Sequence, residues 1–554
     1  MCNEDTSDMK DVPIGNDNFR KIRENDGYYV DKTELIKDIL SKRNTDVFLF
    51  TRPRRFGKSL NISMLDAFFN LRYKGNKWFD GLKIQDDEES MTQVNDNPVI
   101  SITMKDLDDN SFNVFLDDFR LKIQEVCRSY EYLRRWDTES GLKQSFVDLY
   151  DGKVGLSGLK RSLRDISCAL EEYHGKKVII LIDEYDDPMN RTFGKNIQKD
   201  VIAFMRDLMS NALKTNPALR FGVVTGVMQI AKESIFSGLN NLYVNNVMSN
   251  DFSEYFGFTE SEVVDMLDFY GHPEKMDEVR EWYDGYRFGS HDIYNPWSLL
   301  NYIAKGFIPD SYWAGTSGNS IIESLVDVAD DETMDDLRAL ASGGAVVTGM
   351  RSDMVYSDIE GNPDLAYPVM VMSGYLNARM DDDGCHLSIP NKEVYSVYRD
   401  AILPKERGSI YTKDIRNLYN AMKGNDDESI RIHLNDLIKD VLSARILDNE
   451  HVYQAFLIGM MMGFCGNYRI YGDTRETGEG YADIIFERIS GTGPNMIVEM
   501  KRSEDEGALK KDAELALMQI HSKDYVHGID GKVLLYGISF FKKSSYIISE
   551  VYGQ

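Results

Sequence analysis

The chain has 554 residues, a length that predicts two to four domains, each large enough to bury a core of its own. Its 42% hydrophobic and 28% charged residues are typical of a water-soluble globular protein, and no apolar run approaches the ~18 residues that a membrane-spanning helix needs. The net charge of −27 argues against a general nucleic-acid coat protein, because lysine and arginine supply non-specific DNA affinity, but not against a nuclease with a local basic groove.

The N-terminus and the cysteines bear on the cellular compartment. Residues 1–5 are acidic and lack the apolar stretch of a signal peptide. The five cysteines show no paired spacing: Cys2, Cys127, Cys168, Cys385 and Cys465. Scattered cysteines argue for reduced thiols and against a zinc site or a disulfide framework, so we expect a cytoplasmic protein.

The first pattern that carries chemistry lies at residues 47–60. An apolar β-type run leads into a loop that ends in Gly57-Lys58-Ser59, and apolar residues at helical spacing follow. Strand, loop, Gly-Lys-Ser and helix are the arrangement of a P-loop. The standard pattern has a glycine five residues before Gly57, where this chain has Arg52, so a basic turn that opens an ordinary helix is the alternative.

In a P-loop, main-chain N–H groups and a few side chains hold the phosphates of ATP. Lys58 is expected to reach the β- and γ-phosphate oxygens, and the Ser59 hydroxyl to ligate Mg²⁺. The residues of this loop that we expect to contact the nucleotide are Arg52, Arg54, Arg55, Phe56, Gly57, Lys58, Ser59 and Leu60.

Strands near residues 98–103, 178–182 and 220–226, alternating with helices, predict a mostly parallel sheet with right-handed crossovers. The middle strand is followed by Asp183 and Glu184, at the end of a strand where α/β proteins bind ligands. We expect Asp183 to hold Mg²⁺ through water and Glu184 to orient and activate the attacking water. The alternative is a strand that simply meets solvent at an acidic loop.

The strand at 220–226 ends in Thr225. In P-loop ATPases of the AAA type, the strand beside the P-loop ends in a polar side chain that senses the γ-phosphate, and Thr225 is the candidate for this role. A threonine that caps the next turn is the alternative.

The character of the chain changes after residue 250. Dense aromatic residues with glycine and proline predict a small packed domain, and the acidic stretch at 424–428 is the best candidate for a linker. We therefore divide the chain into a P-loop ATPase domain at 1–250, a helical or winged-helix-like lid and linker region at 251–425, and a third domain at 426–554.

The third domain predicts helices near 430–447 and 451–464, three strands, a helix and a last strand. Within it, Asp483 is followed by Glu499-Met500-Lys501 on the next strand. Alternation along residues 496–501 places Glu499 and Lys501 on one face with Ile497, opposite a buried apolar face. A hairpin brings Asp483 beside Glu499, so that both carboxylates bind Mg²⁺ and the metal and Lys501 lower the cost of forming a hydroxide.

This spacing is that of PD-(D/E)xK nucleases, and a salt-bridged strand pair that faces water is the alternative. Gln519 lies on the helix that follows, where that superfamily often has a polar partner facing the catalytic strands. A glutamine there is equally explained as a surface residue, and Glu476 is a weaker candidate.

Several stretches together resemble the AAA-ATPase-like proteins of Bacteroidetes and related anaerobes, which have an arginine-rich P-loop. The resemblance rests on Arg52 to Ser59, Leu181 to Asp186, Thr225-Gly226, Ala231 to Asn241 and Trp282 to Arg287. It implies a C-terminal domain of the PD-(D/E)xK nuclease superfamily. The chain departs from the family at Tyr481-Ala482, where an arginine expected before Asp483 is missing, which puts a basic phosphate contact in doubt. The P-loop also resembles that of STAND ATPases, which act as ATP-driven switches.

Together these features predict an α/β protein: an AAA/STAND-like P-loop domain, a helical or winged-helix middle region and a C-terminal αβββαβ domain. We expect an ATP-hydrolysing switch coupled to a Mg²⁺-dependent nuclease that acts on nucleic acid, in defence against mobile DNA. DNA is favoured as the substrate, and the sequence leaves a nuclease that acts on RNA open as a further alternative. The alternative is a P-loop signalling or scaffold ATPase whose nuclease-like domain binds a partner without cutting. We expect no membrane partner, and a homo-oligomer is left open.

Overall fold

The computed structural model describes fifteen stretches of the chain. They are residues 10–228, 236, 242–313, 336–337, 339–340, 344–348, 366–381, 384–398, 403–442, 450–462, 468–472, 475–478, 480–489, 493–529 and 531–553. Most of Ala231 to Asn241, which contributed to the resemblance, lies outside them. None of the described helices combines the length and the apolar character that crossing a membrane requires.

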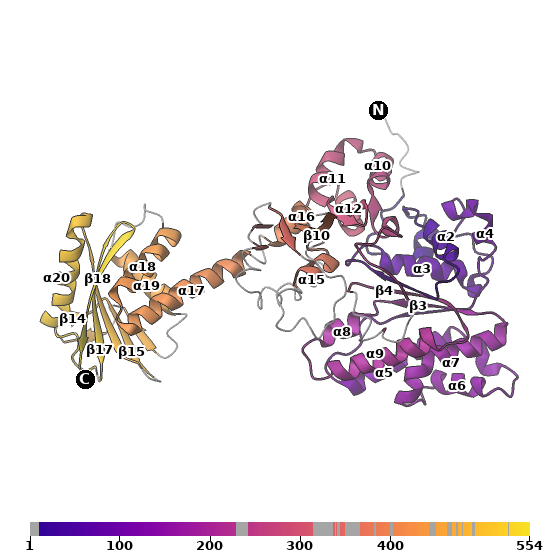
Figure 1. Cartoon of the computed structure of the whole chain (residues 1–554), viewed down its shortest axis with the longest axis horizontal. Coiled ribbons are helices and arrows are strands. Elements are labelled where there is room, and N and C mark those ends of the chain that lie inside the picture. The colour runs from indigo at the N-terminus through magenta and orange to yellow at the C-terminus, as the bar shows by residue number, and fades with distance from the viewer. Residues whose placement is uncertain are drawn as a thin grey trace. The chain divides into compact units, whose positions relative to one another are not determined.

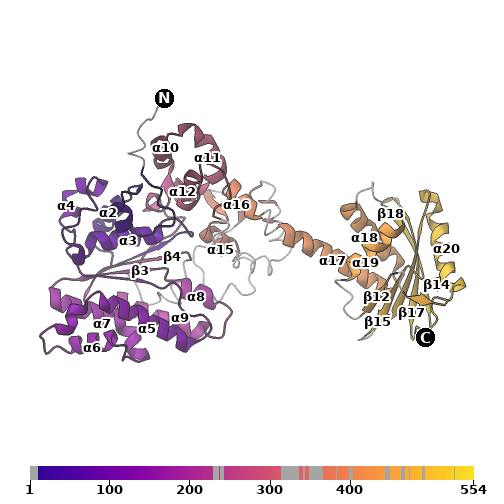
Figure 2. The same cartoon turned by 180° about the vertical axis from the view of Figure 1, so that it is seen from behind.

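The chain forms two compact units, Met1–Ile402 and Leu403–Gln554, which are described separately below (Figures 1 and 2). The first unit contains the expected ATPase segment together with most of the expected middle region. The division into three domains stays a prediction.

The first unit is built on a five-stranded parallel sheet with the order β2-β3-β4-β1-β5. Its strands β1 and β3 are buried at every residue, which explains their unbroken apolar sequences. Strand β4 lies between them, so the strand that ends in Thr225 is the neighbour of the P-loop strand, as expected. The strands are β1 Val47–Thr51, β2 Val99–Thr103, β3 Val178–Asp183, β4 Leu219–Gly226 and β5 Leu242–Asn245.

Helices cover both faces of this sheet. Figures 1 and 2 show α2, α3 and α4 on one face and α5, α6, α7 and α9 on the other. The helices are α1 Phe19–Glu24, α2 Glu34–Ser41, α3 Lys58–Phe69, α4 Glu88–Met91, α5 Phe112–Arg128, α6 Gly141–Tyr150, α7 Leu156–His174, α8 Asp187–Thr192 and α9 Gln198–Met209.

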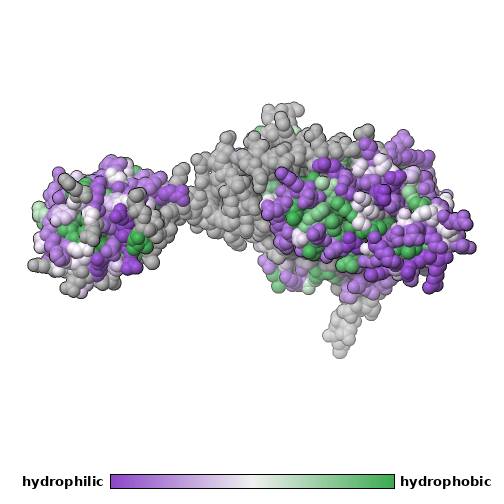
Figure 3. Space-filling model, turned by 90° about the horizontal axis from the view of Figure 1, so that it is seen from below, coloured by the Kyte–Doolittle hydropathy of each residue, from purple (hydrophilic) through white to green (hydrophobic). Residues whose placement is uncertain are grey.

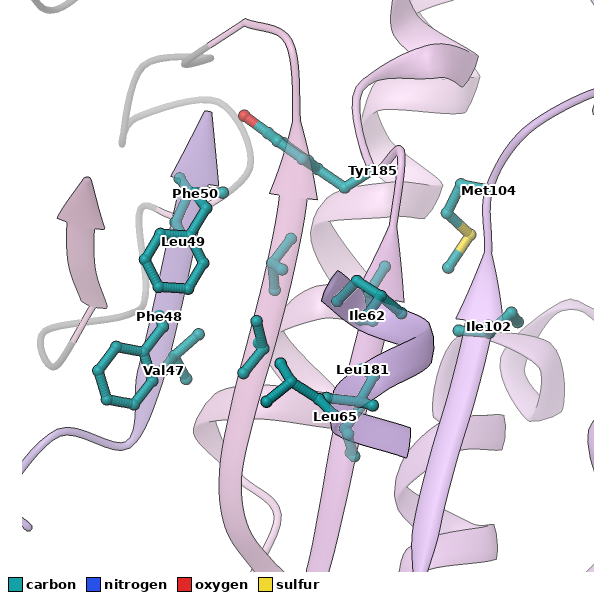
Figure 4. Close-up of a cluster of buried hydrophobic side chains, with 14 of the residues drawn as sticks. Val47, Phe48, Leu49, Phe50, Ile62, Leu65, Ile102, Met104, Leu181 and Tyr185 are labelled. Carbon is teal, nitrogen blue, oxygen red and sulfur yellow. The ribbon is translucent and has the colours of Figure 1, made fainter. Parts of the chain in front are cut away.

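The core of this unit fills the space between the sheet and its helices. Figure 4 shows Phe48 and Phe50 of β1, Leu65 of α3 and Leu181 of β3 among the buried side chains. Each is at most 1% exposed, and burying a side chain of this size stabilises the fold by about 1.5–3 kcal/mol. The rigid sheet therefore fixes where its strands end, and the candidate site is built at those ends.

The surface formed by α5 and α7 is mostly hydrophilic, with apolar residues among the polar ones (Figure 3). The large apolar side chains exposed on these two helices are Val114, Leu121, Leu156 and Tyr173. Scattered apolar residues are normal on a folded surface, so we assign no role to this face.

The middle part of the first unit combines helices with two small antiparallel sheets, ordered β6-β8-β7 and β10-β11-β9. Its dense tyrosine and phenylalanine residues form a packed core, as the sequence indicated. The elements are β6 Phe258–Thr259, α10 Glu260–Phe269, α11 Met276–Tyr283, β7 Tyr286–Phe288, β8 His291–Tyr294, α12 Pro296–Ala304, β9 Val346–Thr348, α15 Ala366–Ser373, β10 Asn377–Asp381, β11 Gly384–Ser388 and α16 Lys392–Val397.

The second unit contains a five-stranded mixed sheet ordered β12-β15-β16-β17-β18, in which only the β16–β17 pair is parallel. Figures 1 and 2 show α20 on one face of this sheet and α18 and α19 on the other. The elements are α17 Leu403–Gly424, α18 Asp427–Val441, α19 Glu450–Met462, β12 Tyr468–Tyr471, β13 Glu476–Thr477, β14 Gly480–Tyr481, β15 Ile484–Arg488, β16 Asn495–Arg502, α20 Leu509–Ser522, β17 Val533–Phe541 and β18 Ser544–Tyr552.

Three details of this unit differ from the expectations. The stretch at 424–428 is a tight turn between α17 and α18, whose residues pack in one core, rather than a linker. Strand β18 was not expected. Residues 495–500 are all buried, because helices cover both faces of the sheet: Ile497 lies on the face predicted for it, but that face is covered by α20.

Candidate functional site

The loop between β1 and α3 has the backbone that a P-loop requires. Gly57 adopts φ +81°, a left-handed conformation that glycine reaches without strain, immediately before the first residue of α3. A Cβ atom at this position would meet no atom within 4 Å, so the backbone angle and not lack of space explains the glycine. The turn directs the chain into α3, whose first N–H groups have no partner within the helix and suit an anion.

Lys58 lies across this loop. Its ammonium donates to the carbonyl oxygens of Arg52 at 2.9 Å and Pro53 at 2.8 Å, and the side chain is buried. Burial lowers the pKa of Lys58 to about 8, although the nearby charges of Asp183 and Asp186 oppose this shift. Phosphate oxygens are better acceptors than neutral carbonyls, so a nucleotide would draw the ammonium away from them.

Asp183 joins three elements of the site. The Ser59 hydroxyl donates to its Oδ2 at 2.6 Å, and the Thr225 hydroxyl donates to its Oδ1. The sequence-predicted residues of α3, β3 and β4 therefore converge at one carboxylate. Oxygen donors of this kind suit Mg²⁺.

Glu184 follows directly with φ +51°, a conformation that non-glycine residues adopt rarely and that is common at functional sites. Burial is the main reason that its pKa is raised, and the negative charge of Asp183 raises it further. A carboxylate of raised basicity at the edge of a cleft suits the role of general base expected for it.

Asp186 is a part of the site that sequence reasoning missed. It is buried, and its Oδ2 accepts from the main-chain N–H groups of Val227 at 3.0 Å and Met228 at 2.8 Å. These bonds fix the chain that follows Thr225. A Cβ atom at Gly226 would lie 2.6 Å from Asp186 Oδ1, which explains the glycine there. The sequence signal that could have indicated Asp186 is that it is the third acidic residue within four positions, after Asp183 and Glu184.

The Arg52 side chain has a different place from the one expected. It is fully buried, and its guanidinium donates to the carbonyl oxygen of Asn245 at 3.0 Å and to that residue's side-chain oxygen at 2.5 Å. The guanidinium also lies 5.0 Å from the ring centre of Phe256, and burial lowers its pKa to about 9. Because β5 and its neighbours hold the guanidinium in the core, we no longer expect it to contact a nucleotide.

The other loop residues divide into two groups. Arg54, Arg55 and Leu60 line the cleft above the sheet, in keeping with the expectation. Phe56 is fully buried, with its ring centre 5.0 Å from that of Tyr286, so only its main chain remains available to a nucleotide.

Residues far along the chain hold the loop from the other side. The guanidinium of Arg55 lies 4.2 Å from the ring centre of Trp297, and the Trp313 indole donates to the Arg54 carbonyl oxygen at 3.3 Å. A Cβ atom at Gly374 would approach the Pro53 side chain to 2.9 Å. The P-loop is thus packed against the middle part of the first unit.

A cleft of about 530 Å³ lies over these groups. The residues that line it and matter below are Arg54, Arg55, Gly57, Lys58, Ser59, Leu60, Lys105, Asp106, Asp183, Glu184, Asp186, Asp187, Arg191 and Trp297. A smaller, mostly apolar pocket of about 70 Å³ shares Gly57 and Leu60 with the cleft and is also lined by Pro13 and Tyr29. The cleft is therefore lined by charged groups and adjoins a mostly apolar pocket.

The second unit brings the other predicted residues together. The main-chain N–H of Asp483 donates to Glu499 Oε2 at 3.4 Å, and the N–H of Met500 donates to Asp483 Oδ2 at 2.5 Å. Glu499 is only 3% exposed, and its pKa is raised to about 8, first by burial and then by the charge of Asp483. The two acids thus lie side by side, as the hairpin argument required.

Gln519 links these acids to the lysine. Its amide nitrogen donates to Glu499 Oε1, and its amide oxygen accepts from the Lys501 ammonium at 2.8 Å. A glutamine that bonds two site residues from the next helix is not a free surface residue, which decides between the two readings of Gln519.

Glu450, at the start of α19, was missed. Its Oε2 accepts from the Arg502 N–H at 3.1 Å, and its charge contributes to the raised pKa of Glu499. Nothing in the local sequence singles out an acid at a helix start. Glu476 lies in β13. In the described part of the chain, no three His, Cys, Asp or Glu side chains converge as metal ligands, so Asp483 and Glu499 offer two carboxylates.

Comparison with known proteins places both sites in recognised families. A model described as "Predicted AAA-ATPase" matches residues 13–236, and a model of the PD-(D/E)XK nuclease superfamily matches residues 448–550. An uncharacterized protein in the vnfD 5' region of Azotobacter chroococcum mcd 1 is 30% identical over 439 residues, which cover 75% of each chain. The chain belongs to the AAA-ATPase-like family.

The expected fold class is therefore confirmed: an AAA-type domain and a PD-(D/E)XK-type domain in one chain. All P-loop, β3 and β4 site residues of this AAA-ATPase-like protein lie in the first matched range. Asp483, Glu499, Lys501, Gln519 and Glu450 lie in the second.

Proposed function

We propose that this protein binds and hydrolyses ATP in the cleft of the first unit, and that the nucleotide state controls a Mg²⁺-dependent nuclease in the second. The observation that supports the first activity best is the convergence of Ser59 and Thr225 on Asp183 beside the Lys58 loop. Family membership supports ATPase and nuclease-type chemistry in general terms.

For ATP binding, the α3 N-terminus and the Lys58 ammonium hold the β- and γ-phosphates. The apolar pocket beside Leu60 and Pro13 suits the nucleobase. Ser59 and Asp183 would hold Mg²⁺, which neutralises phosphate charge when bound.

For hydrolysis, Glu184 takes a proton from the attacking water, whose oxygen then bonds to the γ-phosphorus as the bond to the β–γ bridging oxygen breaks. Thr225 is positioned by Asp183 to contact the γ-phosphate from β4. After hydrolysis the γ-phosphate leaves and Thr225 loses this contact, which would distinguish the ATP-bound state from the ADP-bound state.

For nuclease action, Asp483 and Glu499 would hold Mg²⁺, which polarises the scissile phosphate when bound. Gln519 orients both Glu499 and Lys501. The Lys501 charge lowers the cost of deprotonating the water that attacks phosphorus, and the bond to the leaving sugar oxygen breaks.

Charge distribution is compatible with nucleic acid as the substrate of the second unit, and we propose DNA in the first place. Residues 403–554 carry 19 lysines and arginines against 23 aspartates and glutamates, so they account for only 4 of the 27 net negative charges. The repulsion of phosphates by the chain's acidity is thus concentrated in the first unit. A role in defence against mobile DNA is the biological form of this proposal.

One observation favours the alternative, a nuclease-like domain that binds a partner without cutting. The family's arginine before Asp483 is replaced here by Tyr481-Ala482, and the Tyr481 side chain is 50% exposed. An exposed aromatic residue beside the site suits a binding surface.

Incubation with plasmid DNA, linear DNA and RNA, with Mg²⁺ and with or without ATP, separates the two. Cleavage by the wild-type protein that is lost in Glu499→Gln and on chelation of Mg²⁺ supports the nuclease. If the protein binds nucleic acid or another protein but cuts no substrate under any of these conditions, the alternative of a scaffold ATPase is supported instead.

A further inference from the structure

The loop after β2 presents a lysine to the ATP cleft that no motif singles out. Thr103, the last residue of β2, pairs in register with Asp183, and the Met104 N–H donates to the Asp183 carbonyl oxygen at 2.9 Å. Lys105 comes next and lines the cleft together with Glu184.

The turn at Lys105 is held on both sides. The Lys105 N–H donates to the Thr103 hydroxyl at 3.3 Å, and the Asp106 N–H donates to Asp187 Oδ2 at 3.2 Å. Asp106 has φ +60°, a conformation that a non-glycine residue keeps only when its surroundings impose it. The pair between Arg191 and Asp106, at 3.4 Å, adds a further contact. The lysine is therefore carried on a fixed turn.

Most cations of the cleft already have partners. Lys58 donates to two carbonyls, Arg55 lies over an indole ring and Arg191 pairs with an aspartate. The charge of Arg54 acts on the Asp187 carboxyl. Lys105 is exposed and forms no ion pair with a described residue. Its positive charge nevertheless acts on Glu184, where it partly opposes the rise in pKa that burial causes. It is an available cation on the side of the cleft where Glu184, the proposed general base, lies.

We propose that Lys105 binds the γ-phosphate of ATP from the side opposite Lys58. This inference rests on the proposed ATPase function and adds a residue to it. The γ-phosphate of ATP would lie beside the acidic residues Asp183 and Glu184, which repel it. A cation held on a fixed turn offsets that repulsion. ADP has no group at this position.

During hydrolysis the water oxygen bonds to the γ-phosphorus, its proton passes to Glu184, and the electron pair of the breaking bond stays on the β-phosphate oxygen. Lys105 keeps all its protons and holds the γ-phosphate oxygens throughout. The residue therefore favours both the bound ATP and the transition state over bound ADP.

The test compares ATP and ADP affinities of the full-length protein in Mg²⁺ for Lys105→Met and for Lys74→Met. Lys74 is an exposed lysine outside the cleft and serves as the matched control. We expect Lys105→Met to weaken ATP about 10- to 100-fold, with ADP within about 2-fold of wild type, since hydrogen bonds to charged groups have this strength. Lys105→Gln should repeat the result, and Lys105→Arg should restore part of the ATP affinity.

Two outcomes would overturn the inference and leave the proposed function standing. Equal affinities of wild type and Lys105→Met for ATP would place Lys105 outside the phosphate site. If Lys105→Met kept wild-type ATP affinity and only the pH dependence of its ATP hydrolysis moved to higher pH, Lys105 would act only through the pKa of Glu184. A wild-type protein that binds neither ATP nor ADP would instead refute the proposed function itself, and the inference with it.

Discussion

Ser59 and Asp183, which are 124 residues apart in the chain, are joined by a hydrogen bond of 2.6 Å from the hydroxyl to the carboxylate. This contact connects the first turn of α3 to the end of β3. A P-loop whose pattern lacks its first glycine is thereby placed in the spatial setting that such a loop needs for Mg²⁺ and ATP.

Lys58→Ala should abolish measurable ATP binding. The change removes the ammonium that the loop directs at the phosphates, and loss of charge-assisted bonds worth about 1.5–3 kcal/mol each corresponds to roughly 10- to 100-fold in affinity per bond. Calorimetric titration with Mg-ATP measures this, with Lys74→Ala as the control. Unchanged affinity in Lys58→Ala would disprove the P-loop assignment.

Glu184→Gln should keep ATP binding and lose hydrolysis by about 10²- to 10⁴-fold, because the amide keeps the shape but cannot accept the proton of the water. Phosphate release and ATP affinity are measured on the same preparation. Asp183→Asn should instead weaken the Mg²⁺-dependent part of binding. A Glu184→Gln protein that is folded but no longer binds ATP would argue for a structural role.

Mg²⁺ binding to the second unit should depend on pH through Glu499, whose pKa is raised to about 8. The protonated acid cannot ligate the metal, so affinity should rise from pH 6 to 9 with the release of a proton. In the absence of metal, folding stability should change with pH in the direction opposite to that of Mg²⁺ affinity. The folded state retains the proton that the unfolded state loses from about pH 4.5, so stability should fall as pH rises toward about 8. Calorimetry in buffers of different ionisation enthalpy measures the proton, and Glu499→Gln should remove both dependences.

Gln519→Ala should reduce any nucleic-acid cleavage by about 10- to 100-fold with the fold retained, since outer partners that orient metal ligands typically matter to this extent. The amide joins Glu499 to Lys501, and both lose their positioning in the variant. Cleavage rates and Mg²⁺ affinity are compared with those of Met518→Ala, a change at the neighbouring exposed side chain. Equal rates in the two variants would assign Gln519 no part in the site.

Arg52→Ala should lower stability, because it leaves the buried oxygens of Asn245 without their donors, and each buried group left unsatisfied costs about 1–3 kcal/mol. The first thermal transition of the full-length protein reports this effect. Arg52→Lys should recover little, since a single ammonium does not replace the planar guanidinium. A stable Arg52→Ala protein with specifically weakened ATP binding would reinstate the original expectation for this arginine.

The local sequence was sufficient to predict those parts of the structure where a strand pattern ends in residues with recognisable chemistry. The strands that end near Asp183 and Thr225 are continuous apolar runs, and the hairpin around Glu499 follows from its turn and spacing. These features let the strands of the sheet and both groups of acids be predicted, whereas the place of the Thr225 strand beside the P-loop was expected from the similarity to AAA-type ATPases.

What could not be predicted depends on contacts between distant parts of the chain. Arg52 looks like a phosphate ligand from its place in the motif, but its partner Asn245 is 193 residues away. Ile497 lies on the face opposite Met496 and Val498, as the alternation predicts, but its burial could not be predicted because it depends on α20 covering that second face. Glu450 approaches the site from α19, and its neighbours in sequence carry no sign of this.

The contacts of the P-loop with Asn245, Trp297, Trp313 and Gly374 have a practical consequence. A fragment cut after residue 250, at the expected domain boundary, would keep every motif residue of the ATP site and lose three of these four supports. Such a fragment should fail to bind ATP even if it is soluble. Because Trp297 and Trp313 contact Arg55 and Arg54 of this loop, nucleotide binding to the loop should change their fluorescence.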